Sequence, residues 1–141
     1  MAAALLRQRL IADGRTDEVR VLSTGTWAVV GGGAVHHARR VMADRGIDLS
    51  DHRASEISAE MIGEADLLLT MTASQREAVL AEFPSACGKT YLLSEMVGQH
   101  YDIADPYGAS PLVYEYTARE LADLIDRGYA RILDLVGITD G

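Results

Sequence analysis

Helix-like and strand-like patterns alternate along this chain, with no linker, repeat or low-complexity tract between them. Such alternation is typical of α/β proteins, in which helices cover a mostly parallel sheet. The sequence therefore predicts an α/β fold with three layers, α/β/α, around a small parallel sheet. The 141 residues are expected to form a single domain, because this length suits one ordinary core.

The predicted elements follow from apolar periodicity and from capping residues. The helices are expected over residues 2–12 and 34–45, for a turn or two from Ser58, from Thr72 to Phe83, and from Ser110 onward. The strands are expected at residues 19–24, 67–69 and 89–93. The strand at 67–69 lacks polar alternation, so it should be covered on both faces.

The sequence also predicts helix ends and the faces of two helices that are buried. Thr72 and Gln75 have the spacing of a capping box, and Gly14 and Gly46 are placed to end helices. Two apolar faces should pack inward. The first helix contributes Ala3, Leu6 and Leu10, and a stripe of the last helix, which should pack on the sheet, contains Leu121, Ile125, Gly128, Ile132 and Val136.

Charge and cysteine content restrict the partners and the compartment. The formal net charge is -8 and the isoelectric point is near 4.8, which opposes binding to nucleic acid or to an acidic membrane surface. No stretch approaches the roughly 18 apolar residues of a membrane span, and no signal segment opens the chain. The single cysteine, Cys87, suits a reducing compartment. We therefore expect a cytoplasmic protein without nucleic-acid or membrane partners.

The first helix lacks an N-terminal cap. No Ser, Thr, Asp or Asn precedes its first turn, although the first amides of a helix need acceptors. This is natural for a helix that continues from an upstream segment. We therefore expect that residues preceding Met1 belong to the same domain.

Four segments together resemble the low-molecular-weight protein tyrosine phosphatase family in order and spacing. They are residues 24–27 (TGTW), 45–53 (RGIDLSDHR), 65–72 (ADLLLTMT) and 102–108 (DIADPYG). The resemblance covers essentially the whole chain. It implies that a strand and a Cys-x5-Arg-Ser phosphate loop lie just upstream of Met1, so that residues 1–141 form an N-terminally truncated domain without its central first strand.

The resemblance implies a function and a stability problem. The complete protein is expected to transfer phosphate from a phosphotyrosine protein or an aryl phosphate to the upstream cysteine, with no metal or organic cofactor. The truncated chain should be inactive. Removing a central strand leaves buried backbone groups unpaired, so a chain that folds alone is expected to repair its sheet by strand exchange or as a homodimer.

Asp105 is the candidate general acid. It lies between the last strand and the last helix, on the side of an open α/β sheet where ligands usually bind. A carboxylate beside the phosphate can protonate the leaving oxygen and later accept a proton from water, and Pro106 restricts the backbone next to it. Asp102 is the nearest competitor and is assigned as a solvated or helper carboxylate.

Three other residues are assigned by the resemblance, each with a structural alternative. Trp27 and Tyr107 are candidate walls of the substrate cleft, since an aromatic face can stack on a phosphotyrosine ring; either side chain can instead pack within its own loop. His52 is a candidate support of the phosphate loop, and its alternative is a surface histidine.

Cys87 and the nearby basic residues are poor candidates for the phosphate site. A nucleophilic cysteine needs an electropositive cradle, and no arginine follows Cys87 six residues later. Arg7 and Arg9 lie too far into the first helix, and Arg53 is not assigned as the phosphate ligand. Two alternatives to the enzyme stay open: a pseudophosphatase that acts as a binding module, and an arsenate reductase of the same fold, which requires more cysteines.

Overall fold

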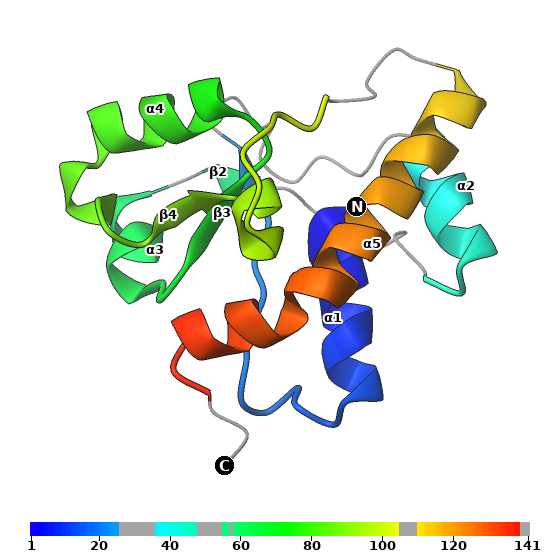
Figure 1. Cartoon of the computed structure of the whole chain (residues 1–141), viewed down its shortest axis with the longest axis horizontal. Helices are drawn as coiled ribbons and strands as arrows, with labels where there is room; N and C mark the ends of the chain where they lie inside the picture. Colours follow the sequence, from blue (N-terminus) through cyan, green and yellow to red (C-terminus); the bar gives the residue numbers. More distant parts are fainter. Residues whose placement is uncertain (26–35, 48–54, 57, 105–109, 139–141) are drawn as a thin grey trace.

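The computed structural model describes residues 1–25, 36–47, 55–56, 58–104 and 110–138 (Figure 1). In chain order its elements are α1 (Ala2–Ala12), β1 (Thr24–Gly25), α2 (His36–Asp44), β2 (Ser55–Glu56), α3 (Ala59–Glu64), β3 (Leu68–Thr70), α4 (Ala73–Glu82), the 3-10 turn η1 (Pro84–Ala86), β4 (Thr90–Leu92), the 3-10 turn η2 (Leu93–Val97) and α5 (Pro111–Leu135).

All described strands are parallel to their partners. β1 pairs with β2, and β3 pairs with β4 in the register Leu68 to Thr90 and Thr70 to Leu92. Within the described residues these are two separate pairs and not one continuous sheet. The predicted α/β class with a small parallel sheet is confirmed.

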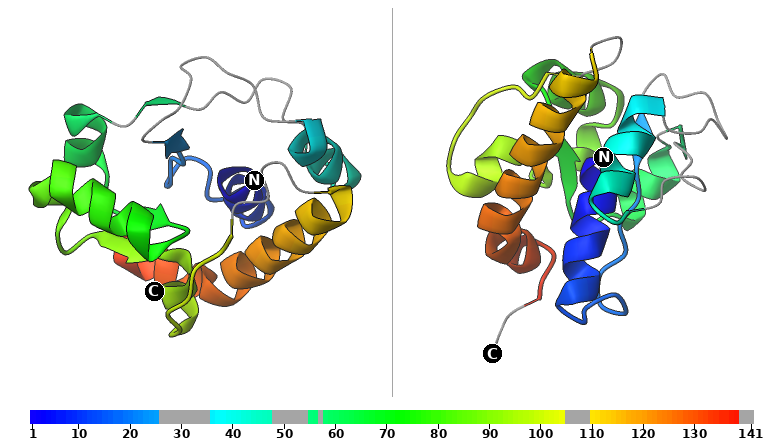
Figure 2. Two further views of the ribbon diagram at one scale, coloured as in Figure 1. Left: turned by 90° about the horizontal axis from the view of Figure 1, so that it is seen from above. Right: turned by 90° about the vertical axis from the view of Figure 1, so that its right-hand side faces the viewer.

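Two hydrophobic clusters lie on opposite faces of β3. Leu69 packs against the main cluster, which is built from α1, α2, η2 and α5, whereas Leu68 packs against a smaller cluster from α3, α4 and η1. The α3–α4 side and the α1–α5 side are seen flanking the β3–β4 pair in Figures 1 and 2. The expectation that this strand is covered on both faces is confirmed, although Leu68 and Leu69 are only half-buried.

Helix α1 has the predicted bounds and the predicted ends. Met1 occupies the N-cap position without a side-chain hydrogen bond, and Gly14 follows the C-cap with a φ of +69°. The predicted buried face is partly wrong. Because the helix opens with Met, Ala and Leu on all sides, its pattern does not select one face, and the buried residues are Ala4, Leu5 and Leu10.

The strand predicted at residues 19–24 is largely wrong, since only Thr24 and Gly25 are in a strand. The preceding residues lie against α1 instead. The Arg7 guanidinium donates two hydrogen bonds, of 3.2 and 2.6 Å, to the Val21 carbonyl, and this carbonyl is thereby used outside any sheet. The short strand β2 was not predicted, because two polar residues carry no strand pattern.

The starts of α3 and α4 follow the capping predictions. Ser58 Oγ accepts from the Met61 amide at 3.2 Å, and Thr72 Oγ1 accepts from the Gln75 amide at 3.1 Å. The capping box at α4 is displaced by one residue. The Gln75 side chain accepts from the Met71 amide at 2.9 Å and not from that of Thr72.

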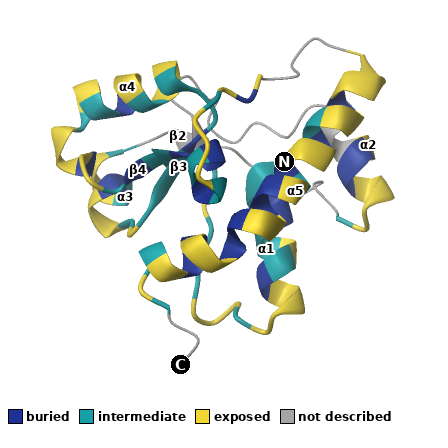
Figure 3. Cartoon of the chain, viewed as in Figure 1, coloured by how far each residue is buried: buried dark blue, intermediate teal, exposed yellow. Residues whose placement is uncertain are grey.

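Helix α5 is the longest element, with 25 residues, and its buried side faces α1 in Figure 3. Of the predicted stripe, Leu121, Ile125, Gly128 and Ile132 are buried and Val136 is half-buried. Its main contacts are with η2, α1 and α2. The prediction that the stripe packs on the sheet is confirmed in part, because Leu69 of β3 and Tyr91 of β4 pack against the cluster that holds it.

Candidate active site

The four candidate site residues, Asp105, Trp27, Tyr107 and His52, lie outside the described residues. The structure therefore describes the elements to which they are attached. Trp27 follows β1, His52 precedes β2, and Asp105 and Tyr107 stand between residue 104 and the start of α5. We call residues 105–109 the acid segment.

The chain approaches the acid segment along the carboxyl end of β3. The Ile103 amide donates to the Met71 carbonyl at 2.9 Å, and Met71 is the first residue after β3. Ile103 is 3% exposed. Ligands of open α/β folds bind outside the carboxyl ends of parallel strands, so the residues leading to Asp105 are at the edge where a substrate is expected.

On its other side the acid segment is followed directly by α5. Ser110 occupies the N-cap position and Pro111 is the first helical residue, where its fixed φ suits a helix start. The Tyr114 side chain, one turn further, is 3% exposed in the main core. The predicted start of this helix at Ser110 and Pro111 is confirmed.

Asp102 has a defined structural contact. Its Oδ1 accepts a hydrogen bond of 2.9 Å from the amide of Ala73, the first residue of α4. The sequence predicted Asp102 only as a solvated or helper carboxylate. Its partner is 29 positions away in the sequence, so no local pattern could reveal this contact.

Cys87 belongs to the connection between η1 and β4. It is exposed and precedes β4 by three residues, at the amino end of that strand. The nearby cation is engaged elsewhere: Lys89 Nζ donates to the Ile62 carbonyl at 2.6 Å and to the Ala65 carbonyl at 2.8 Å. Both observations support the interpretation of Cys87 as a connecting residue.

The arginines of α1 also have structural partners. Arg7 binds the Val21 carbonyl, as described above, whereas Arg9 lies 4.2 Å from the centroid of the Tyr129 ring and 3.5 Å from Asp126. These contacts agree with the prediction that neither arginine is the phosphate ligand.

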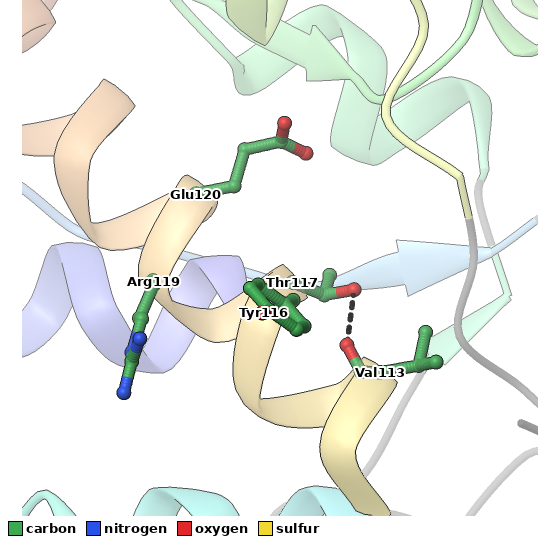
Figure 4. A pocket seen from close by; sticks show the side chains of 5 residues that line it. All are labelled: Val113, Tyr116, Thr117, Arg119 and Glu120. Atoms are coloured by element: carbon green, nitrogen blue, oxygen red, sulfur yellow. Dashed lines mark hydrogen bonds between the residues drawn. The ribbon is translucent and has the colours of Figure 1, made fainter. Parts of the chain in front are cut away.

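An open hollow of about 420 Å³ lies on the outer surface of α5 (Figure 4). Among the described residues, its lining comes from α5: Val113, Tyr116, Thr117, Arg119 and Glu120. The Thr117 hydroxyl donates to the Val113 carbonyl at 2.9 Å. A surface formed by one helix lacks the convergent groups of a catalytic site.

Metal-binding clusters and membrane-spanning helices are both absent from the described part of the chain. Within it, no three His, Cys, Asp or Glu side chains are arranged to hold a metal ion. No helix there combines the length and apolarity required to cross a bilayer.

The protein thus has an α/β fold in which the residues that lead to Asp105 are bonded at the carboxyl end of the parallel strand β3. Residues 1–134 match the model of the family described as low molecular weight phosphotyrosine protein phosphatase. The chain belongs to this family.

The chain is similar to three proteins that are phosphatases or probable phosphatases. The probable low molecular weight protein-tyrosine-phosphatase EpsP of Ralstonia nicotianae is 38% identical over 128 residues, covering 91% of this chain and 80% of EpsP. A protein-arginine-phosphatase of Geobacillus stearothermophilus is also 38% identical over 128 residues, covering 90% and 82%. The crystal structure of a low molecular weight protein tyrosine phosphatase from T. tengcongensis has a TM-score of 0.87 and 34% identity, covering 92% of this chain and 88% of that one.

Proposed function

We propose that this protein hydrolyses phosphate monoesters on proteins, with phosphotyrosine as the preferred substrate and Asp105 as the general acid. The observation that carries the proposal is the hydrogen bond from the Ile103 amide to the Met71 carbonyl, two residues before Asp105. This bond holds the chain at the carboxyl end of β3. Membership of the phosphatase family supports the same reaction.

The proposed reaction has two steps. In the first, a cysteine thiolate upstream of Met1 attacks phosphorus, the bond to the tyrosine oxygen breaks, and Asp105 donates its proton to that oxygen. In the second, water attacks the cysteinyl phosphate while the Asp105 carboxylate accepts a proton, which releases phosphate and regenerates the thiolate. Backbone amides and an arginine of the upstream loop stabilise the charge that develops on the phosphate oxygens.

The aromatic and histidine assignments complete the proposed site. Trp27 and Tyr107 form the walls on which the phosphotyrosine ring stacks, and His52 supports the phosphate loop. The substrate is a phosphoprotein or an aryl phosphate. No cofactor takes part in this mechanism.

The first experiment compares two purified proteins with an aryl phosphate as substrate. One is this chain, and the other, the extended form, continues upstream to the preceding in-frame start. Activity of the extended form alone supports the proposal. Inactivity of both, with each shown to be folded by circular dichroism, favours the pseudophosphatase, a binding module.

The role of Asp105 is tested in the extended form by Asp105→Asn. Loss of a proton donor should depress turnover of aryl phosphates with poor leaving groups by about a hundredfold or more, and turnover of those with good leaving groups far less. Equal losses for both substrates would remove Asp105 from the acid role.

Phosphoarginine is the second candidate substrate, and the Geobacillus stearothermophilus relative favours it because its identity equals that of EpsP. Peptides with phosphotyrosine and phosphoarginine at the same position discriminate between the two. A higher kcat/KM for phosphotyrosine supports the main proposal, and the reverse order replaces it.

The assembly and the compartment are also part of the proposal. The described strands form two separate two-stranded pairs, and the family resemblance implies a further strand in the middle of the sheet. We therefore place this chain in a homodimer whose strands supply the missing pairing. Light scattering tests this, and a monomeric mass would refute it. The single cysteine is consistent with a reducing cytoplasm.

A further inference from the structure

The three residues that precede Ala104 are each fixed to the body of the protein by a different contact. Tyr101 is held through its backbone by Ser94, whose hydroxyl accepts from the Tyr101 amide at 3.0 Å and donates to its carbonyl at 2.8 Å. Ser94 has no exposed surface. The backbone at Tyr101 is therefore held by a buried side chain.

Asp102 makes the next contact, a hydrogen bond through its side chain, whereas Tyr101 and Ile103 are hydrogen-bonded through their backbones. Its carboxylate accepts from the Ala73 amide at 2.9 Å. The first amides of a helix have no acceptor within the helix, and a negative charge at this end is favoured by the helix dipole. Asp102 is therefore attached to a site on α4 that favours a carboxylate.

Ile103 completes the attachment through its buried side chain and its bond to Met71. After Ala104, the chain enters the acid segment, and α5 begins directly beyond it. Asp102, three residues before Asp105 in the sequence, is therefore bonded to the start of α4 on the approach to the acid segment.

The start of α4 has three amides that are satisfied by three different side chains. The Gln75 side chain accepts from Met71, the Thr72 hydroxyl accepts from Gln75, and Asp102 accepts from Ala73. The first two acceptors belong to α4 or its cap. Of these three acceptors, Asp102 is the one that joins α4 to the residues that lead to the acid segment.

We propose that Asp102 is a positioning residue, which acts by fixing the origin of the acid segment on α4 and thereby the place of the Asp105 carboxylate. This inference rests on the proposed acid role of Asp105. Small displacements of a catalytic group reduce rates strongly, so an anchor three residues away can affect proton donation without contacting the substrate.

The first test uses this chain and hydrogen exchange measured by mass spectrometry. Asp102→Ala removes the acceptor, Asp102→Asn retains an oxygen that can accept, and Thr72→Ala is the matched control because it removes another acceptor at the same end of α4. We expect Asp102→Ala to speed exchange at residues 104–109 about tenfold. Asp102→Asn should stay within about twofold of the parent, and Thr72→Ala should affect α4 without affecting residues 104–109.

Two results of this test would overturn the proposal. One is unchanged exchange at residues 104–109 in Asp102→Ala. The other is an equal increase there in Asp102→Ala and Thr72→Ala, since this would show that Asp102 merely stabilises α4.

The second test uses the extended form and separates this inference from the acid assignment. Asp102→Ala should lower kcat about tenfold for aryl phosphates with poor leaving groups and less than about twofold for good ones, and Asp102→Asn should restore most of the loss. If Asp105→Asn shows no dependence on the leaving group, the acid assignment fails. If only Asp102→Ala lacks that dependence, the positioning role fails and the acid assignment stands.

Discussion

The Tyr129 hydroxyl on α5 donates a hydrogen bond of 2.9 Å to the carboxylate of Asp13 at the end of α1. The same carboxylate accepts from Arg15 at 2.7 Å, and Arg9 covers the Tyr129 ring. Tyr129 is only 6% exposed. These contacts join α1 and α5 beside a third hydrophobic cluster, of Leu10, Tyr129 and Leu133.

Tyr129→Phe should lower the free energy of unfolding by about 1 kcal/mol. The ring and its contact with Arg9 are kept, so the loss reports the hydroxyl alone. Urea unfolding measures the effect. Tyr116→Phe is the control, because Tyr116 is 62% exposed on the same helix and its substitution should change nothing measurable. Equal losses in both variants would contradict the assigned contact.

The same pair predicts how stability depends on pH. The hydrogen bond from Tyr129, followed by that from Arg15, lowers the pKa of Asp13, whereas burial, followed by the bond to Asp13, raises the pKa of Tyr129. The stabilisation of the folded state by Asp13 is present above its pKa in the unfolded chain, which is about 4. It is lost as the pH falls through the lower pKa that Asp13 has in the folded protein. The stabilisation of the folded state by Tyr129 is present below the unfolded pKa of about 10. It is lost as the pH rises through the higher pKa that Tyr129 has in the folded protein.

Urea titrations at acidic and alkaline pH check this dependence. Tyr129→Phe should lose less stability than the parent at alkaline pH, because the titrating phenol is removed. It should also lose less at acidic pH, because the hydrogen-bond donor to Asp13 is removed. Identical pH profiles for the parent and the variant would show that the pair does not contribute.

Gly128→Ala tests the closest approach of α5 to η2. A β-carbon at Gly128 would lie 2.6 Å from the Met96 β-carbon, which is too close without a shift of the backbone. Overpacking should outweigh the better helix propensity of alanine, and the variant should lose about 1 to 2 kcal/mol. Gly63→Ala is the matched control in α3, where the added carbon meets no atom within 4 Å; it should be neutral or stabilising. The reverse order would contradict the packing described.

Lys89→Met tests how much the hydrogen bonds at the C-terminal end of α3 contribute to stability. The Lys89 ammonium donates to two carbonyls at the end of that helix, and methionine retains an apolar stem without the donors. We expect a loss of about 1 to 2 kcal/mol in urea unfolding. Arg127→Met removes an exposed pair with Asp123 and should cost less than about 0.5 kcal/mol. Similar losses in both variants would show that the hydrogen bonds of Lys89 contribute no more to stability than an exposed ion pair.

Trp27→Ala addresses the proposed aromatic wall in the extended form. The variant should lose preference for aryl over alkyl phosphates, because stacking benefits only the aryl substrate. The ratio of kcat/KM values measures this preference. An unchanged ratio would return Trp27 to a packing role.

The helices were predictable because their ends are encoded locally. Ser58, Thr72 and Pro111 mark helix starts within a few residues, and the structure confirms all three. The strands were less predictable, since strand formation depends on a partner from elsewhere in the chain. Val19 to Leu22 have the composition of a strand, yet Arg7 binds the Val21 carbonyl and the strand begins only at Thr24.

The site shows the same division. Chemistry-bearing residues such as Asp105 and Trp27 were selected by their motifs, and their roles stay predictions. The contact between Asp102 and Ala73 has no sequence signal, because it joins residues that are distant along the chain. The residues that hold a site in place are determined by the tertiary fold. Sequence motifs identify mainly the residues that take part in the chemistry.

The leucine run through β3 has a consequence for strand register. A slip by one residue normally exchanges the two faces of a strand, but here it would replace one leucine by another. Apolar side chains therefore discriminate poorly between the two alignments. Thr70 differs from the leucines, because its hydroxyl is within hydrogen-bonding distance of the Tyr91 carbonyl on β4. A slip of one residue would carry this polar group to a different partner, at the same end of β3 to which the chain at Ile103 is bonded.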